Sequence, residues 1–292
     1  MAGTVGRLLG LAAAALLCAC GGGEERQSAA PWLNPHGEAP VVGSLAVNPA
    51  DNALWMATNT GLFRVRDGAP QRVTGKLRAG QISEQLVIRF TGPDELLASG
   101  HPASAGTLPE VLGLIRSEDA GRTWTSVSGF GTADFHAIER SGDRLIGGLS
   151  GQAQVQVSAD DGATWQTRTA PGVLTDLEVD PTDHRRWVAS TAEGVYLTTD
   201  EGATWRPVAP TPNSDFAWPA AETLFRLDPG GDLLASRDGG REWERVGATG
   251  GEPQALVAAD PMTLYALLLD GRVKRSGDGG RTWTDLVTPV TA

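Results

Sequence analysis

Five copies of one eight-residue pattern constrain the fold of this chain more than any other feature. The pattern is Ser/Thr-x-Asp-x-Gly-x-Thr-Trp, with Glu242 replacing the Thr in the fourth copy. The copies, called the octets below, begin at Ser117, Ser158, Thr198, Ser236 and Ser276. Their starts are 41, 40, 38 and 40 residues apart. A fixed period of this length is typical of architectures in which each repeat is one supersecondary unit.

A sixth, eroded copy begins at Val65, where Asp67 keeps the acid but Gln71 and Arg72 replace the Thr-Trp ending. The segments before the octets also repeat, as short β-branched or aromatic runs separated by Asp-Pro and Gly turns, so each unit reads as four strands. Units of about 40 residues with four strands are typical of propeller blades. We therefore expect an all-β, six-bladed β-propeller over residues 41–292, with five intact octets and one eroded copy.

The octets predict turn architecture rather than catalysis. A Ser or Thr hydroxyl and an Asp carboxylate can bond turn amides, Gly supplies a positive φ, and Trp buries its ring. In a propeller this turn joins the third and fourth strands, on the face opposite the one that usually holds ligands. We expect structural roles for Asp119, Asp160, Asp200, Asp238 and Asp278, and for Trp124, Trp165, Trp205, Trp243 and Trp283.

The octet resembles the Asp box, or BNR repeat, of sialidase-like β-propellers. With the runs ASGHP, LGLI and ADFHAI, the chain resembles exported bacterial BNR proteins loosely named glycosyl hydrolases. The resemblance implies the fold, but it leaves activity open, because photosystem assembly propellers with the same repeat are protein-binding platforms. A sialidase would also need an arginine triad and a tyrosine nucleophile. Tyr196 and Tyr265 fall in predicted third and second strands, away from the inner ends, and the Arg-Ile-Pro motif is absent.

One connection breaks the repeat. Val65 and Ser117 are 52 residues apart, and the excess falls in 100–110, which we assign to the second-to-third-strand connection of blade two. The next connection on the same face, 128–136, leads into blade three. We expect His101, Glu110, Asp134 and His136 to converge on the upper face, where His and carboxylate groups could serve binding, proton transfer or a metal, or could simply cap loop backbone.

Two functions remain open for this face. The first is binding of a protein or glycan without chemistry, with His101, Glu110, Asp134, His136 and Arg89 as binding residues. The alternative is a glycoside hydrolase, with Glu110 and Asp134 as candidate carboxylates if the inserted loop folds over the face. Arg89 could equally reach the central channel or pair with a carboxylate, and Trp218 reads as packing between blades. We expect no cofactor and no bound metal, since only the convergence of the ligands is inferred.

The N-terminus reads as an export leader. Arg7 precedes an apolar run from Leu8 to Ala19, too short for a spanning helix and typical of a signal peptide. Leu17-Cys18-Ala19-Cys20 resembles a bacterial lipobox, so we expect a lipoprotein signal peptide over 1–19 and lipidated Cys20 at the mature N-terminus; an ordinary signal peptide cleaved nearby is the alternative. Residues 20–40 then form a flexible tether. The protein is placed in a bacterial cell envelope, anchored on the extracytoplasmic side of a membrane.

Charge and cysteine content narrow the partners. Both cysteines lie in the leader, which excludes disulfides and cysteine nucleophiles in the folded part. The net charge is -11 and no stretch combines basic with aromatic residues, which argues against nucleic acid. We expect a monomer whose partner is a protein or a carbohydrate, with the lipid anchor as its only contact with the membrane.

Overall fold

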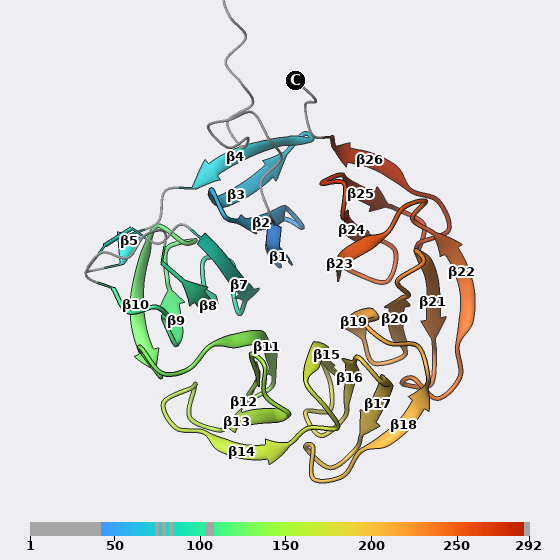
Figure 1. Cartoon of the computed structure of the whole chain (residues 1–292). Helices are drawn as coiled ribbons and strands as arrows, with labels where there is room; N and C mark the ends of the chain where they lie inside the picture. The colour runs from blue at the N-terminus through green and yellow to red at the C-terminus, as the bar shows by residue number, and fades with distance from the viewer. Residues whose placement is uncertain (1–41, 74–75, 78–79, 82–83, 103–107, 289–292) are drawn as a thin grey trace, which may run out of the picture.

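The computed structural model describes residues 42–73, 76–77, 80–81, 84–102 and 108–288. They form six antiparallel sheets arranged as blades around a central axis, each following the previous one along the chain (Figure 1). This confirms the predicted all-β, six-bladed propeller. In the described part of the chain no helix is long and apolar enough to cross a membrane. The predicted leader, Cys20 and the tether lie outside the described residues.

Every blade begins with its innermost strand and ends with its outermost one (Figure 1). Blade one contains β1 (Val42–Val47), β2 (Leu54–Thr58), β3 (Gly61–Arg66) and β4 (Ala69–Val73). Blade two contains β7 (Glu84–Phe90), β8 (Leu96–His101), β9 (Leu114–Ser117) and β10 (Thr123–Ser128). Two short strands, β5 (Lys76–Leu77) and β6 (Gly80–Gln81), extend its outer edge, where β5 pairs in parallel with β10. This extension was not expected from the repeat pattern.

The other four blades have four strands each. Blade three contains β11 (Phe135–Ser141), β12 (Arg144–Leu149), β13 (Gln154–Ser158) and β14 (Gln166–Thr169). Blade four contains β15 (Leu174–Val179), β16 (Trp187–Thr191), β17 (Gly194–Thr198) and β18 (Arg206–Ala209). Blade five contains β19 (Asp215–Ala220), β20 (Thr223–Leu227), β21 (Asp232–Ser236) and β22 (Glu244–Ala248). Blade six contains β23 (Pro253–Ala258), β24 (Leu264–Leu268), β25 (Val273–Ser276) and β26 (Thr284–Val287).

The core lies between the blades rather than within one layer. Each of six clusters of buried apolar side chains spans one pair of neighbouring blades, and one of them joins blade one to blade six. At that last interface the Tyr265 hydroxyl donates to the Asn52 carbonyl at 3.2 Å. Among the described residues the ring therefore closes by packing between the first and last blades, whose strands form separate sheets.

The octets form the turns between the third and fourth strands of blades two to six. In the second octet, Asp160 Oδ1 accepts from the Ser158 hydroxyl at 2.8 Å and from the Thr164 amide at 2.8 Å, and Oδ2 accepts from the Thr164 hydroxyl at 2.6 Å. Asp161 and Gly162 have φ of 57° and 87°. A Cβ on Gly162 would lie 2.3 Å from Leu114 Cδ2 in the neighbouring blade, so this position needs glycine for packing as well as for the turn.

The octet tryptophans pack between blades. Trp124 is buried, and Trp165, Trp205, Trp243 and Trp283 are half-buried against four different core clusters. In the eroded copy, β3 and β4 are joined by two residues only, Asp67 and Gly68, which have positive φ of 50° and 76°. The turn of blade one is therefore shorter than the octet turns. Because the strands alternate in direction, all these turns lie on the face where the innermost strands end. We call it the lower face, and the opposite one the upper face.

Candidate functional site

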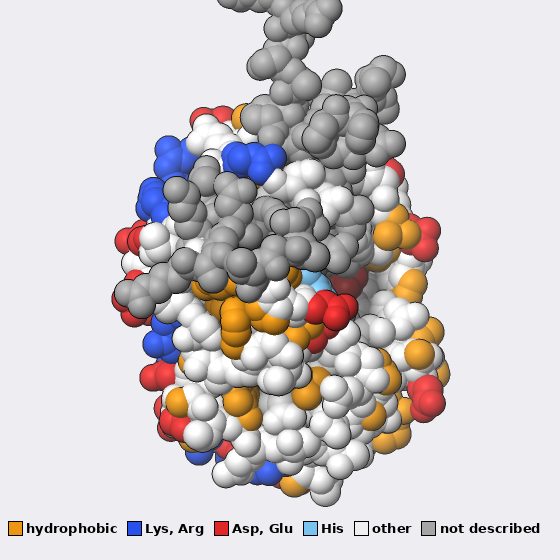
Figure 2. All heavy atoms as spheres, turned by 60° about the vertical axis from the view of Figure 1, so that its left-hand side comes forward, with side chains coloured by type: hydrophobic (Ala, Val, Ile, Leu, Met, Phe, Trp, Pro, Cys, Tyr) orange, Lys and Arg blue, Asp and Glu red, His pale blue; other side chains and the backbone are white. Residues whose placement is uncertain are grey.

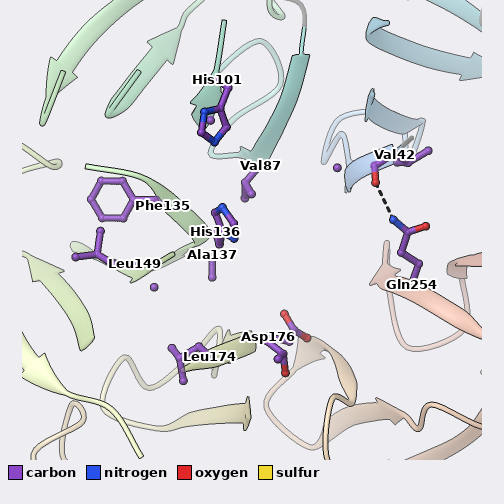
Figure 3. A pocket seen from close by; sticks show the side chains of 14 residues that line it. Val42, Val87, His101, Phe135, His136, Ala137, Leu149, Leu174, Asp176 and Gln254 are labelled. Atoms are coloured by element: carbon purple, nitrogen blue, oxygen red, sulfur yellow. Dashed lines mark hydrogen bonds between the residues drawn. The ribbon is translucent and has the colours of Figure 1, made fainter. Parts of the chain in front are cut away.

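A pocket opens at the centre of the upper face, where the innermost strands begin (Figure 3). Its volume is about 560 Å³. Its walls carry Val42 of β1, Val87 of β7, His136 of β11, Asp176 of β15 and Gln254 of β23. The amide of Gln254 donates to the Val42 carbonyl at 3.0 Å, which ties blade six to blade one at the rim. Apolar and polar groups from five blades thus face one open space.

The described start of the inserted connection and the end of the next upper-face connection meet beside this pocket. His101 is the last residue of β8, just before the inserted connection, and Asp134 and His136 flank Phe135 at the start of β11. The Phe135 amide donates to the buried Ser99 hydroxyl of β8 at 3.1 Å, which holds the two strand ends together. Successive strand residues point to opposite sides, so burial of Phe135 turns Asp134 and His136 the other way. Figure 2 shows histidine and acidic side chains gathered on this side of the molecule.

His101, Asp134 and His136 form a compact cluster. Asp134 Oδ2 lies 3.2 Å from His136 Nε2 and 3.6 Å from His101 Nε2. The three ligand atoms lie within 4.8 Å of one another, and no other group of three such side chains does so among the described residues. The expected convergence of these three residues is therefore present.

Glu110 takes a different place from the one we expected. Its backbone carbonyl lies 2.8 Å from His101 Nδ1, but its side chain is exposed and does not line the pocket. The loop supplies a main-chain acceptor here, and in the described structure Glu110 and Asp134 do not form a pair across the pocket.

Arg89 lies deeper than expected. We predicted it among upper-face features, but it is the sixth residue of β7 and lines the channel below the pocket. Its Nη2 lies 2.5 Å from Glu139 Oε2, and its Nη1 lies 3.6 Å from Glu178 Oε1. An innermost strand runs from the upper to the lower face, so a residue near its end cannot reach the upper rim. Arg89 therefore both faces the channel and pairs with carboxylates.

Four carboxyl groups around this arginine were missed by sequence reasoning. They belong to Glu139, Asp176, Glu178 and Asp215, on the innermost strands of blades three, four and five. Burial raises the pKa of Glu139 well above its usual range, against the opposing effect of Arg89. Burial, with the nearby Asp215 carboxylate, likewise raises the pKa of Asp176 well above the usual range, and burial raises that of Asp215 to about 7. Burial in the channel thus shifts the titration of these carboxyl groups toward the protonated form.

A signal for this cluster exists in the alignment of the innermost strands. Arg89, Glu139 and Glu178 each follow a buried Ile or Leu directly, and Asp176 and Asp215 each precede a buried apolar residue. Charged residues at matching places in innermost strands indicate a polar channel. The amides of Leu177 and Phe216 also donate to the Asp176 carboxylate, at 2.9 and 2.6 Å, so this group links blades four and five as well.

The aromatic candidates are structural. Trp218 is buried between blades four and five, with the Arg186 guanidinium 5.5 Å from its ring centroid. Tyr196 lies in β17 and Tyr265 in β24, the third strand of blade four and the second of blade six, as predicted. No tyrosine lines the upper pocket in the described structure.

Comparison with known proteins supports the fold more than any activity. No family model matches the chain. A xyloglucanase of Paenibacillus sp is 32% identical in an alignment of 143 residues that covers 44% of this chain and 12% of that protein. The chain therefore matches only a small part of this much longer enzyme.

Two solved structures share the propeller architecture. An ancestral GH74 enzyme has a TM-score of 0.55 and 18% identity, over 83% of this chain and 37% of that one. A YCF48 protein with D1 peptide bound has a TM-score of 0.51 and 17% identity, over 84% of this chain and 80% of that one. At these identities the likeness shows a shared β-propeller fold, in relatives that include a glycoside hydrolase and a peptide-bound protein.

Proposed function

We propose that this propeller is a binding module whose upper pocket receives a short segment of a protein or a glycan, without chemistry of its own. The observation that carries the proposal is the pocket itself, which collects two histidines, a carboxyl group, an amide and apolar side chains from five blades. Clefts with a mainly apolar wall and a few placed polar groups are typical ligand sites. The proposal is supported by the structure of YCF48, a propeller of similar fold that has a D1 peptide bound.

A blocking variant tests the proposal. Thr175 is exposed and lines the pocket, so Thr175→Trp fills the space without removing a buried contact. The matched control is Thr167→Trp on the outermost strand of blade three, away from the pocket. Glycan arrays and peptide libraries should yield a ligand that binds the wild-type chain and the control but not Thr175→Trp. A ligand that binds all three equally would place binding elsewhere.

The proposed setting is the extracytoplasmic side of a bacterial membrane, with Cys20 as the lipidated residue. The support is the sequence, a short apolar leader that ends in Leu17-Cys18-Ala19-Cys20. Cys20→Ala should release the protein from the membrane fraction of expressing cells, whereas Cys18→Ala should leave it attached. Persistent membrane association of Cys20→Ala would contradict the anchor.

Glycoside hydrolysis is the second candidate function. It is favoured by the partial match to a xyloglucanase and by Asp176, which lines the pocket and whose pKa is raised, mainly by burial, as a general acid requires. A panel of glycosides including xyloglucan should give no turnover if the module only binds. Turnover by the wild-type chain that is lost in Asp176→Asn, and kept in Glu110→Gln, would instead establish an enzyme with Asp176 at its centre.

A further inference from the structure

We propose that His101, Asp134 and His136 bind one transition-metal ion of the zinc class at the rim of the upper pocket. The sequence alone led us to expect no metal, because it could not show that the ligands converge. Four observations on this cluster now favour a metal site, and none depends on which partner the pocket receives.

The first observation is spacing. In a tetrahedral site with metal–ligand bonds of about 2.0–2.1 Å, neighbouring ligand atoms are about 3.3 Å apart. The two distances from Asp134 Oδ2, 3.2 and 3.6 Å to the histidine Nε2 atoms, lie on either side of that value. The third separation is within 4.8 Å. The side chain of His136 is 58% exposed, so it can rotate toward His101 without disturbing the core.

The second observation is the tautomer of His101. A backbone carbonyl only accepts hydrogen bonds, so the contact of 2.8 Å to the Glu110 carbonyl places a proton on His101 Nδ1. In the neutral ring, Nε2 then presents a lone pair toward Asp134. Metal-binding histidines commonly donate their other ring N–H to a backbone carbonyl in this way, which fixes the ring and leaves Nε2 for the metal.

The third observation is the contact that this tautomer produces. His101 Nε2 and Asp134 Oδ2 are 3.6 Å apart, which is longer than the 2.7–3.2 Å of ordinary N–H···O hydrogen bonds. While Nε2 is unprotonated, these two acceptor atoms repel unless a proton or a metal ion lies between them. A bound metal ion would turn that repulsion into two coordination bonds.

The fourth observation concerns the other carboxylate oxygen of Asp134. Oδ1 is buried and has no hydrogen-bond partner among the described residues. A buried carboxylate oxygen that lacks a hydrogen-bond donor is costly unless nearby positive charge compensates it. A divalent ion held by Oδ2 and the two imidazoles supplies that charge.

The donor set also specifies the kind of ion. Two imidazoles and one carboxylate suit Zn²⁺ and similar transition metals, whereas Ca²⁺ and Mg²⁺ prefer oxygen ligands throughout. Three protein ligands leave a position for water or for an oxygen of a ligand. Because His101 and His136 also line the pocket, an ion here would stand where an oxygen ligand in the pocket can reach it.

Zinc titration of the full-length chain tests the site. Cys18→Ser and Cys20→Ser remove the competing thiolates, and the protein is purified without a histidine tag and stripped with a chelator. Calorimetry should show one zinc ion per chain. Cobalt should give the visible absorption bands of a four-coordinate ion, and zinc should raise the melting temperature, because it binds the folded state.

Three variants decide the ligands. His101→Ala and His136→Ala should each weaken zinc binding roughly 100-fold or more, since even supporting residues of metal sites cost 10- to 100-fold. Asp134→Asn preserves the shape of the side chain and should also lose affinity and the cobalt bands. Circular dichroism of the metal-free proteins verifies that each variant is folded.

His184 provides the matched control. Its Nε2 lies 2.8 Å from Glu201 Oε1, so it is also a histidine paired with a carboxylate, but it belongs to no group of three ligands among the described residues. His184→Ala should bind zinc as the parent chain does. The proposal is overturned if the parent binds no stoichiometric zinc, or if zinc binding survives in His101→Ala and His136→Ala; in either case the cluster is a simple ion pair.

Discussion

The carboxyl groups of the octet turns and those of the central channel are the same chemical group in opposite surroundings. In the octets, hydroxyl and amide donors surround an exposed aspartate, and the bonds from Thr164 and Ser158 lower the pKa of Asp160 to about 2. In the channel, acids from neighbouring blades share Arg89, and burial raises the pKa of Asp215 to about 7. The two pKa shifts have opposite signs because hydrogen bonds to the carboxylate stabilise its charged form, whereas loss of water destabilises it.

The two sets of carboxyl groups also differ in where their partners lie in the sequence. Each octet supplies the hydroxyl and amide donors to its own aspartate from within eight residues, so the turn folds in a similar way in blades two to six. The channel acids lack enough local donors, and they meet only because the ring brings their blades together. Ionisable groups whose pKa is shifted far from its usual value are more frequent at functional sites.

Removal of the channel arginine should have the largest effect. Arg89→Met leaves Glu139 and Glu178 buried without their cation, which typically costs about 3–5 kcal/mol. Urea unfolding at about pH 8 should show this loss, and at about pH 5 the loss should shrink because the raised pKa values leave the acids protonated. Arg245→Met, which breaks the exposed pair with Asp232, is the control and should change little. An equal loss at both pH values would show that the carboxylates do not cause it.

The second-largest effect is expected from replacing a channel acid with a neutral side chain, which should increase the free energy of unfolding at alkaline pH. The pKa of Asp215 is raised from 3.8 to about 7, so the folded state holds a proton that the unfolded state releases, and stability falls as pH rises through this interval. With allowance for water in the channel, the fall is on the order of 2 kcal/mol. Asp215→Asn should flatten this slope and stabilise the protein at about pH 8. A steep slope that persists in the variant would assign it to other groups.

The same Asp-to-Asn substitution in an octet should lower the stability of the protein instead of raising it. Asp119 accepts from the Thr123 amide at 2.7 Å and from its hydroxyl at 2.6 Å. Asp119→Asn replaces one acceptor oxygen with a donor and should destabilise the protein by about 1 kcal/mol. Because the pKa of Asp119 is lowered on folding, this cost is present above its unfolded value and disappears as pH falls through the folded one. Stabilisation by Asp119→Asn at neutral pH would contradict the distinction between the two regions.

The smallest stability change is expected from a single octet hydroxyl, and its readout is a titration. Thr164→Val removes the donor that lowers the pKa of Asp160 most. Carboxyl NMR should show this pKa rise from about 2 toward 3.8, while Asp278, in an intact octet, stays at about 2. An unchanged pKa of Asp160 would show that the remaining donors, the Thr164 amide and the Ser158 hydroxyl, are sufficient to lower it.

The sequence predicted the upper-face cluster better than the channel. His101, Asp134 and His136 stood out because they lie in the one connection that departs from the repeat and in the next connection on the same face, and the structure brings them together. Glu110 did not join them, since a loop position does not fix which way a side chain points. Arg89 was grouped with the upper face, with the central channel as the open alternative, and the structure places it in the channel because an innermost strand ends toward the lower face.

The sequence by itself determined the features that form within one octet of eight residues or one blade of about forty. The octets specify their own turns, since each supplies every hydroxyl, carboxylate and glycine that the turn needs, and their spacing counts the blades. Only the tertiary structure decided which innermost-strand residues share the channel and how close the histidines come. Those contacts join residues of different blades, and their distances depend on how six interfaces close one ring.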